Sequence, residues 1–292
     1  MILFFLLSGF LIAGTTLNKP TSYNFANFVF DRGARIFVPY IPALAFLVAV
    51  GLLFRLDGPY DPATIMANMA MLQDYPLHRL IAWFPEFDRV GVGRPLWSVA
   101  MEWWLYMGFG AVFFFRRMPP WGWILAVPGL VVVSYNAIGG MLAITWFFAA
   151  GVAWTFDRLP KAPWALLCGA FALFAAERLK ISPARFYDLQ FTLLLGAALF
   201  SGLKAIEGWR PHQLVASAAA GCAAFSYTLY LVHYPFLSLT PGWQGFVWAN
   251  LFAVAMWFLF ERHYPVIAAL LRHEAQPLAV RTVGPAPSDL KA

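Results

Sequence analysis

The segment Ala34–Phe54 decides the class of protein, because it reads ARIFVPYIPALAFLVAVGLLF and carries one charge, Arg35, in 21 residues. A transmembrane α-helix needs about 20 mostly apolar residues to cross the hydrocarbon core. The whole chain of 292 residues agrees, with 61% hydrophobic residues, 12% charged residues and a mean hydropathy of +0.67. A soluble domain is about half apolar and about a quarter charged. The sequence therefore excludes a soluble enzyme, a disordered chain and a nucleic-acid-binding domain, and it predicts a polytopic membrane protein.

Apolar runs bounded by charges, proline or glycine predict an all-α bundle of about nine transmembrane helices. The expected spans are Ile2–Thr16, Ala34–Phe54, Leu96–Phe115, Gly122–Ala137, Met141–Phe156, Trp164–Ala176, Phe186–Leu203, Leu214–Leu239 and Gly245–Phe260. They form a single domain, residues 1–272, and the Pro-, Ala- and charge-rich segment 273–292 predicts a disordered cytoplasmic tail. Between the second and third spans, the long loop from Arg55 to Arg94 holds a short apolar patch, Ile65–Leu72. That patch predicts a re-entrant or interfacial segment.

The distribution of Lys and Arg predicts the orientation, because short cytoplasmic loops carry an excess of these residues. Alternate loops place most of the 20 basic residues on one side, among them Lys19, Arg117 and Arg158. The tail is then cytoplasmic, and nine spans put Met1 outside. Since the first apolar run starts at Met1 without a basic leader, this topology favours a missing first helix, lost through truncation or a misplaced start.

Ionisable groups within apolar sequence are candidate functional residues, because a charge in the bilayer is costly. Arg32 and Arg35 lie three residues apart, so in a helix they share one face. Two guanidinium groups on one face suit a phosphate-bearing ligand. The alternative is ordinary basic flanking of a membrane span. The sequence contains no metal-ligand cluster, glycine-rich phosphate loop or nucleophile elbow.

A second candidate set lies in the third predicted span. Ser98, Glu102 and Tyr106 are spaced i, i+4 and i+8, so they form a polar stripe on an apolar helix. A buried glutamate costs several kcal/mol unless it is paired or protonated, which marks Glu102 as a functional candidate. A structural ion pair or a hydrogen-bonded carboxyl group is the alternative.

The third set lies in the eighth predicted span. Ser226, Tyr230 and His233 share a helix face, and Pro235 kinks or ends the helix just after them. His233 is a candidate base or hydrogen-bonding anchor. A histidine that is satisfied within the packing of the bundle is the alternative.

Taken in chain order, these segments resemble the acyltransferase-3 family of bacterial membrane O-acyltransferases, which contains O-antigen and exopolysaccharide acetylases. The resemblance covers nearly the whole chain. The matching pieces are Phe4–Ile12, Arg32–Pro39, Pro95–Tyr106, Ser226–His233 and Glu261 with Pro265. The chain departs from the family at its start, because the family's first helix carries an Arg and a catalytic His, and none of the five histidines here takes that position.

The resemblance implies a ten-helix bundle in the bacterial inner membrane that transfers an acyl group, usually acetyl, from acyl-CoA to a hydroxyl of a carbohydrate or glycolipid acceptor. It implies that Arg32 and Arg35 bind the CoA phosphates and that no metal takes part. The residues implied to surround the reacting groups, in supporting roles, are Ser98, Glu102, Tyr106 and His233. Two other classes of function stay open: a carrier or flippase for a glycolipid, whose helices are commonly broken, and a non-catalytic membrane partner.

Overall fold

The computed structural model describes residues 1–76, 81–131, 137–160, 162–181 and 188–280. Within these ranges the regular structure is helical, apart from an isolated β-bridge between Gln73 and Phe87. The α-helices are α1 (Ile2–Leu17), α2 (Phe25–Leu53), α3 (Pro62–Met69), α5 (Leu96–Phe113), α6 (Gly122–Val131), α7 (Ala137–Thr155), α8 (Trp164–Ile181), α9 (Leu189–Ala205), α10 (Gln213–Ala224), α11 (Ser226–Leu239), α12 (Trp243–Leu259) and α13 (Tyr264–Val280). Short 3-10 helices are η1 (Phe115–Arg117), η3 (Phe156–Arg158) and η4 (Glu261–His263). The all-α prediction is confirmed.

Three stretches of the described chain are long and apolar enough to cross a membrane: Phe25–Leu53, Ile138–Arg158 and Trp243–Arg272. The pair α10 and α11 adds a fourth if it counts as one span bent by 58°. Helices α1, α6 and α9 are apolar but shorter. The described residues therefore support a membrane protein with three or four such stretches, and the predicted count of nine spans is not confirmed.

Helix α2 begins earlier than the apolar pattern predicts. The side chain of Asn24 accepts a hydrogen bond from the backbone N–H of Asn27 at 3.0 Å, and this cap starts the helix at Phe25. Arg32 and Arg35 consequently lie inside α2, where their spacing of three residues places them on one helix face. Pro39 and Pro42 are also inside α2.

The predicted span Leu214–Leu239 is two helices that meet at Phe225. The hydroxyl of Ser226 donates to the carbonyl oxygen of Ala223 at 2.9 Å, so a side chain satisfies a backbone group freed by the break. Most of α10 is exposed along its whole circumference, from Gln213 to Ala223. The apolar pattern does not reveal this break, because both halves are equally apolar.

The long loop between α2 and α5 contains the short helix α3, which overlaps the predicted apolar patch. Asp61 caps this helix by accepting from the backbone N–H of Thr64 at 2.9 Å, and Pro62 occupies the first turn. Asn68 then donates to the carbonyl oxygens of Thr64 and Asp88, both at 2.9 Å. Through Asn68, these bonds join α3 to the later part of the same loop, at Asp88.

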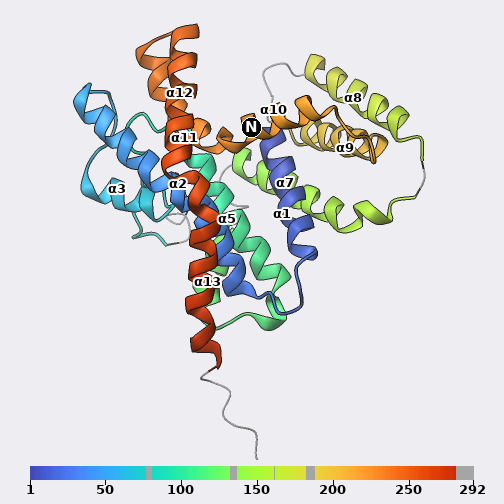
Figure 1. Cartoon of the computed structure of the whole chain (residues 1–292), viewed down its shortest axis with the longest axis horizontal. Helices are drawn as coiled ribbons and strands as arrows, with labels where there is room; N and C mark the ends of the chain where they lie inside the picture. The colour runs from blue at the N-terminus through green and yellow to red at the C-terminus, as the bar shows by residue number, and fades with distance from the viewer. Residues whose placement is uncertain (77–80, 132–136, 161, 182–187, 281–292) are drawn as a thin grey trace, which may run out of the picture.

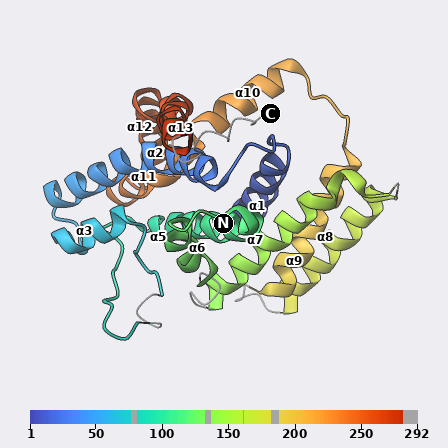
Figure 2. The same ribbon diagram turned by 90° about the horizontal axis from the view of Figure 1, so that it is seen from below.

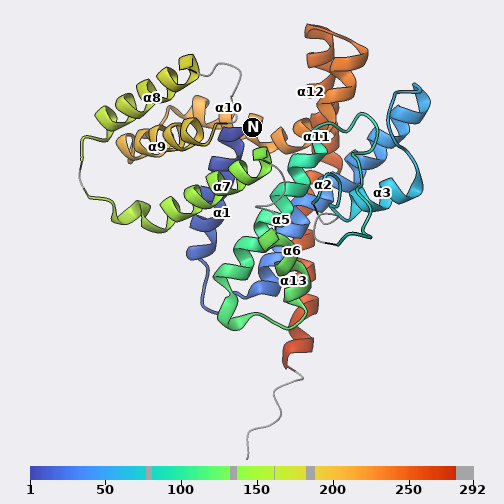
Figure 3. The same ribbon diagram turned by 180° about the vertical axis from the view of Figure 1, so that it is seen from behind.

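The helices form two groups on either side of α1 and α5 (Figure 1). Helices α7, α8 and α9 lie on one side, whereas α2, α3, α11 and α12 lie on the other, as the views from below and behind also show (Figures 2 and 3). Helix α1 packs against α7, α5 against α6, α8 against α9, and α13 against α2. Residues of α1 and α13 face the same cavity, which lies between these helices.

Glycine allows two of these helix pairs to approach closely. A Cβ atom on Gly9 of α1 would collide with the backbone carbonyl of Trp146 in α7. A Cβ atom on Gly108 of α5 would lie 2.7 Å from the carbonyl oxygen of Gly129 in α6. Small residues commonly stand where membrane helices cross, because they let the backbones come together.

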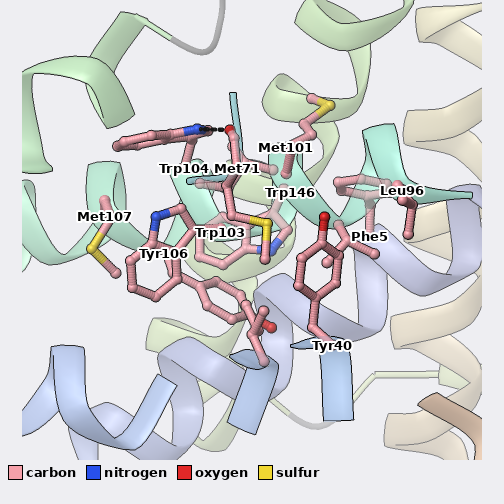
Figure 4. Packing of buried hydrophobic residues seen from close by; sticks show 14 of the residues in the cluster. Phe5, Tyr40, Met71, Leu96, Met101, Trp103, Trp104, Tyr106, Met107 and Trp146 are labelled. Carbon is pink, nitrogen blue, oxygen red and sulfur yellow. Dashed lines mark hydrogen bonds between the residues drawn. The ribbon is translucent and has the colours of Figure 1, made fainter. Parts of the chain in front are cut away.

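The core is aromatic and lies where α1, α2, α5 and α7 meet (Figure 4). Trp146 is fully buried, and its ring centroid lies 6.2 Å from that of Tyr106. Trp104 donates its indole N–H to the carbonyl oxygen of Met71 at 2.6 Å, which ties α5 to the long loop. The core thus fixes α5, the helix that carries the predicted polar stripe.

Helix α13 continues past residue 272, where the sequence predicts the start of the tail, and ends at Val280. Residues 281–292 of the predicted disordered tail lie outside the described residues. So do Arg79, Lys161 and Arg185, which contribute to the predicted orientation.

Candidate functional site

An open cavity of about 880 Å³ lies between α1, α2, α5, α11 and α13. One wall is apolar, since α1 presents the partly exposed side chains of Phe4, Leu7 and Leu11. The other walls carry charged and hydroxyl groups from the remaining four helices. The cavity therefore combines an apolar surface with a polar one in the space between the two groups of helices.

Glu102 is the most buried charged residue in the cavity lining, with 4% of its surface exposed. Its Oε1 accepts hydrogen bonds from the hydroxyls of Tyr106, one turn along α5, and Ser8 of α1, the latter at 3.1 Å. Ser8 in turn accepts from the indole N–H of Trp146 at 3.2 Å. The hydrogen bonds that Glu102 accepts within the described chain all go to Oε1, so Oε2 is available to a group in the cavity.

Arg32 and Arg35 both line this cavity, as their shared helix face predicts. Arg35 lies with its Nη1 3.8 Å from Glu261 Oε1 and its guanidinium 4.7 Å from the centre of the Tyr264 ring. Arg32 lies 5.7 Å from the Phe28 ring, and its buried Nε has no hydrogen-bond partner among the described residues. One of the two cations thus has a nearby carboxylate, and the other has an unused buried donor.

Asp31, the acidic residue next to Arg32 in sequence, is bound elsewhere. It pairs with Arg272 of α13 at 3.0 Å and accepts from the hydroxyl of Tyr23 at 2.9 Å. Burial and the nearby Asp31 carboxylate raise the pKa of Tyr23 above its usual 10, so the phenol stays a donor at neutral pH. These contacts keep Asp31 from neutralising Arg32 directly.

Glu261 stabilises the break between α10 and α11. Its side chain is 1% exposed, and its Oε2 accepts from the backbone N–H of Thr228 at 3.3 Å and from the Thr228 hydroxyl at 2.6 Å. A carboxylate at a helix N-terminus satisfies free N–H groups and complements the helix dipole. The same carboxylate is the one nearest Arg35, so the start of α11 and the cation of α2 are held together.

Ser98 and His233 lie behind the cavity lining. Ser98 is fully buried, and its hydroxyl donates to the Pro95 carbonyl oxygen at 2.8 Å, so it accepts from Tyr230, whose hydroxyl is 2.5 Å away. His233 places Nδ1 2.9 Å from the carbonyl oxygen of Tyr230, an acceptor, which requires the protonated nitrogen to be Nδ1. The structure therefore brings Arg32, Arg35, Glu102 and Tyr106 into one cavity, but it does not bring His233 into the described lining.

Sequence reasoning gave no role to several residues of the cavity. Ser8 is a single hydroxyl in an apolar run, and Arg272 stands at the predicted boundary between the helical domain and the tail. Tyr227 lines the cavity with a buried hydroxyl that has no hydrogen-bond partner among the described residues. The sequence does mark these residues, because they are polar side chains within otherwise apolar helices. It does not show their partners, which lie far away in the chain.

Neither a metal site nor a similar known protein helps to assign a function to the cavity. Within the described ranges, no group of three or more His, Cys, Asp or Glu side chains is placed to hold a metal ion. The chain matches no protein-family model, no curated protein and no solved structure. The function of the cavity is therefore inferred from its own residues.

Proposed function

We propose that the protein is a membrane-bound O-acyltransferase of the acyltransferase-3 type. It transfers an acyl group, acetyl in the simplest case, from acyl-CoA to a hydroxyl of a carbohydrate or glycolipid acceptor. The observation that supports this proposal is a single cavity in which Arg32 and Arg35 face the same space as the buried carboxyl group of Glu102. Four cations and two carboxyl groups line that space, which favours an anionic ligand.

The two ends of acyl-CoA match the two surfaces of the cavity. Arg32, with its unused buried donor, and Arg35 bind the CoA phosphates through charge-assisted hydrogen bonds. The apolar wall formed by Phe4, Leu7 and Leu11 contacts the less polar acyl and pantetheine portion.

Acyl transfer requires an oriented hydroxyl and a base. The acceptor oxygen bonds to the thioester carbonyl carbon, the C–S bond breaks, and the hydroxyl proton passes to a base and then to the CoA thiolate. Glu102, whose Oε1 is fixed by Ser8 and Tyr106, offers Oε2 to the acceptor hydroxyl or to the base. Ser98 acts from behind the lining, because its hydroxyl holds that of Tyr230. His233 has a supporting role there, with its ring oriented by the Tyr230 carbonyl oxygen.

The finer membrane arrangement is part of the same proposal. The chain contributes nine spans of a ten-span family pattern in the bacterial inner membrane, with its C-terminus in the cytoplasm. This orientation follows the excess of Lys and Arg in alternate loops. It places Arg32 and Arg35 toward the cytoplasm, where acyl-CoA is present.

Binding of acetyl-CoA to the purified protein tests the proposal. Replacing Arg32 and Arg35 together by glutamine removes two contacts of about 1.5–3 kcal/mol each, but solvent screens the partly exposed Arg35. We therefore expect affinity to fall roughly ten- to a hundredfold. The matched control is Arg158→Gln with Arg210→Gln, two exposed arginines outside the cavity, which leaves affinity unchanged. Equal affinity in both double variants, with unchanged thermal stability, would return Arg32 and Arg35 to a flanking role.

A glycolipid carrier is the second candidate function, and the 58° break between α10 and α11 favours it. Carriers commonly build their binding sites from discontinuous helices. Reconstituted vesicles distinguish the two functions. A carrier moves a labelled glycolipid between leaflets without acyl-CoA, whereas an acyltransferase incorporates labelled acetyl from acetyl-CoA into the acceptor fraction.

A further inference from the structure

A second cavity, of about 760 Å³, lies at the ends of α1 and α5. It is bounded by the loop that follows α1, residues 18–23, and by η1 at the end of α5. These segments lie side by side in the views from the front and from behind (Figures 1 and 3). Lys19 is the one residue that both cavities share in the described lining. The second cavity is therefore distinct from the proposed acyl-transfer site.

Three exposed cations surround this cavity: Lys19, Arg116 and Arg117. Arg117 donates to the carbonyl oxygen of Thr21 at 3.2 Å, and the Lys19 ammonium lies 5.3 Å from the Tyr23 ring centre. None of the three cations has a carboxylate within 4.0 Å in the described part of the chain. The cluster is thus held together without an acidic partner.

Helix dipoles do not neutralise these cations. The C-termini of α1 and α5 both point to this end of the bundle, and each contributes about half a negative charge. Together they offset about one of the three positive charges. A local excess of roughly two positive charges remains, which complements an anion such as a phosphate group.

The cavity also has an apolar side that a soluble anion would not use. Val112 and Phe115 line it and are 64% and 65% exposed. Val112 belongs to the last turn of α5, and Phe115 is the first residue of η1, directly before the two arginines. An apolar surface that adjoins a phosphate-binding surface matches a lipid, whose chains and headgroup are joined in the same way.

We propose that this second cavity binds an anionic phospholipid. Arg116 and Arg117 contact the headgroup phosphate, Lys19 closes the site from the loop, and an acyl chain lies along Val112 and Phe115. The site differs from simple basic flanking because it combines a cavity, an uncompensated charge and an adjoining apolar surface.

Native mass spectrometry of the full chain in a neutral detergent, titrated with phosphatidylglycerol, tests this proposal. The test variant is Arg116→Gln with Arg117→Gln, and Lys19 is kept because it also lines the first cavity. We expect phosphatidylglycerol to bind roughly tenfold or more weakly, because two of the three cations that face the headgroup are lost. The control pair, Arg158→Gln with Arg210→Gln, binds phosphatidylglycerol like the wild type. Replacing Arg116 and Arg117 by lysine keeps the charge and restores most of the binding, which excludes misfolding as the cause.

Four results would overturn the proposal. They are equal binding of phosphatidylcholine, equal losses in the test and control pairs, displacement of the lipid by glycerol phosphate at similar concentration, and displacement by acetyl-CoA. The third identifies a site for a free anion, and the fourth assigns the cavity to the co-substrate. Arg116 and Arg117 do not line the first cavity, so we expect their variant to keep its acetyl-CoA affinity. Failure here is therefore distinguishable from failure of the proposed acyl transfer.

Discussion

Replacing Glu102 by glutamine separates a catalytic environment from a structural one. The glutamine side chain fills nearly the same volume, and its oxygen can still accept from Ser8 and Tyr106. A hydrogen bond to a charged group contributes about 1.5–3 kcal/mol and a neutral one about 0.5–1.5 kcal/mol, so the two bonds together lose about 2–3 kcal/mol if the carboxyl group is ionised. Removing a buried charge recovers several kcal/mol of desolvation, which offsets this loss. We therefore expect the melting temperature to change little.

Acyl transfer should respond much more strongly than stability. If Glu102 carries negative charge beside the acceptor hydroxyl or its base, we expect glutamine to lower the rate on the order of a hundredfold, or about 2.7 kcal/mol of activation free energy. An Asp-to-Asn change in a serine-protease triad costs about four orders of magnitude. We expect a smaller effect here because the triad carboxylate sets the tautomer of its histidine, whereas Glu102 in the described chain is bonded to the hydroxyls of Ser8 and Tyr106. Incorporation of labelled acetyl from acetyl-CoA in membranes, divided by the amount of folded protein, measures the effect.

The control variant is Ser8→Ala, which removes one donor to Oε1 and leaves the carboxyl group in place. It should lower transfer less than the Glu102→Gln change does, while lowering the melting temperature more. Near-normal transfer by the glutamine variant would refute the reasoning. So would a loss of transfer that only follows the loss of folded protein, because Glu102 would then serve to join α1 to α5.

Three further predictions concern the scaffold. Gly9→Val should destabilise the protein by about 1–3 kcal/mol, because the added side chain overpacks the contact with α7. Thermal unfolding in detergent measures the effect, and an unchanged melting temperature would contradict the prediction. Hydrogen bonds from Arg178 and a backbone N–H hold the pKa of Asp188 at about 2, below its ordinary 3.8. Its stabilising effect should therefore be complete above about pH 5 and lost as the pH falls through about 2. Asp188→Asn should flatten the melting temperature over that interval, and an unaltered pH profile would count against the ion pair. Reporter fusions after Arg117 should be cytoplasmic and fusions in the 55–94 loop external; the reverse pattern would overturn the orientation.

The local pattern of the sequence predicted helices in the nine expected spans and the polar stripe of α5, but it did not predict α13 (Tyr264–Val280). Each expected span corresponds to at least one helix, because apolar runs of this length have few alternatives in a bilayer. Glu102 and Tyr106 are hydrogen-bonded at the predicted i, i+4 spacing. The early start of α2 was also visible in principle, since Asn24 is a favourable cap. The break at Phe225 was not, because it depends on partners from outside the helix.

The partners of the buried polar groups come from distant parts of the chain. Ser8 and Glu102 are 94 residues apart, and the residues of the Asp31–Arg272 pair are 241 apart. The sequence shows that such groups need partners, because an unpaired charge in an apolar interior is costly. Which groups meet depends on helix packing, which an apolar pattern does not specify.

The same requirement for partners identifies the cation that matters most to the proposed function. Arg35 has Glu261 nearby, and Asp31 is already held by Arg272 and Tyr23. Arg32 keeps a buried Nε donor without a partner in the described chain, and it lines the cavity. A buried donor left unsatisfied costs about 1–3 kcal/mol, more when it is charged. A ligand phosphate that accepts from Arg32 removes this cost, so the buried donor of Arg32 favours an anionic occupant of the cavity.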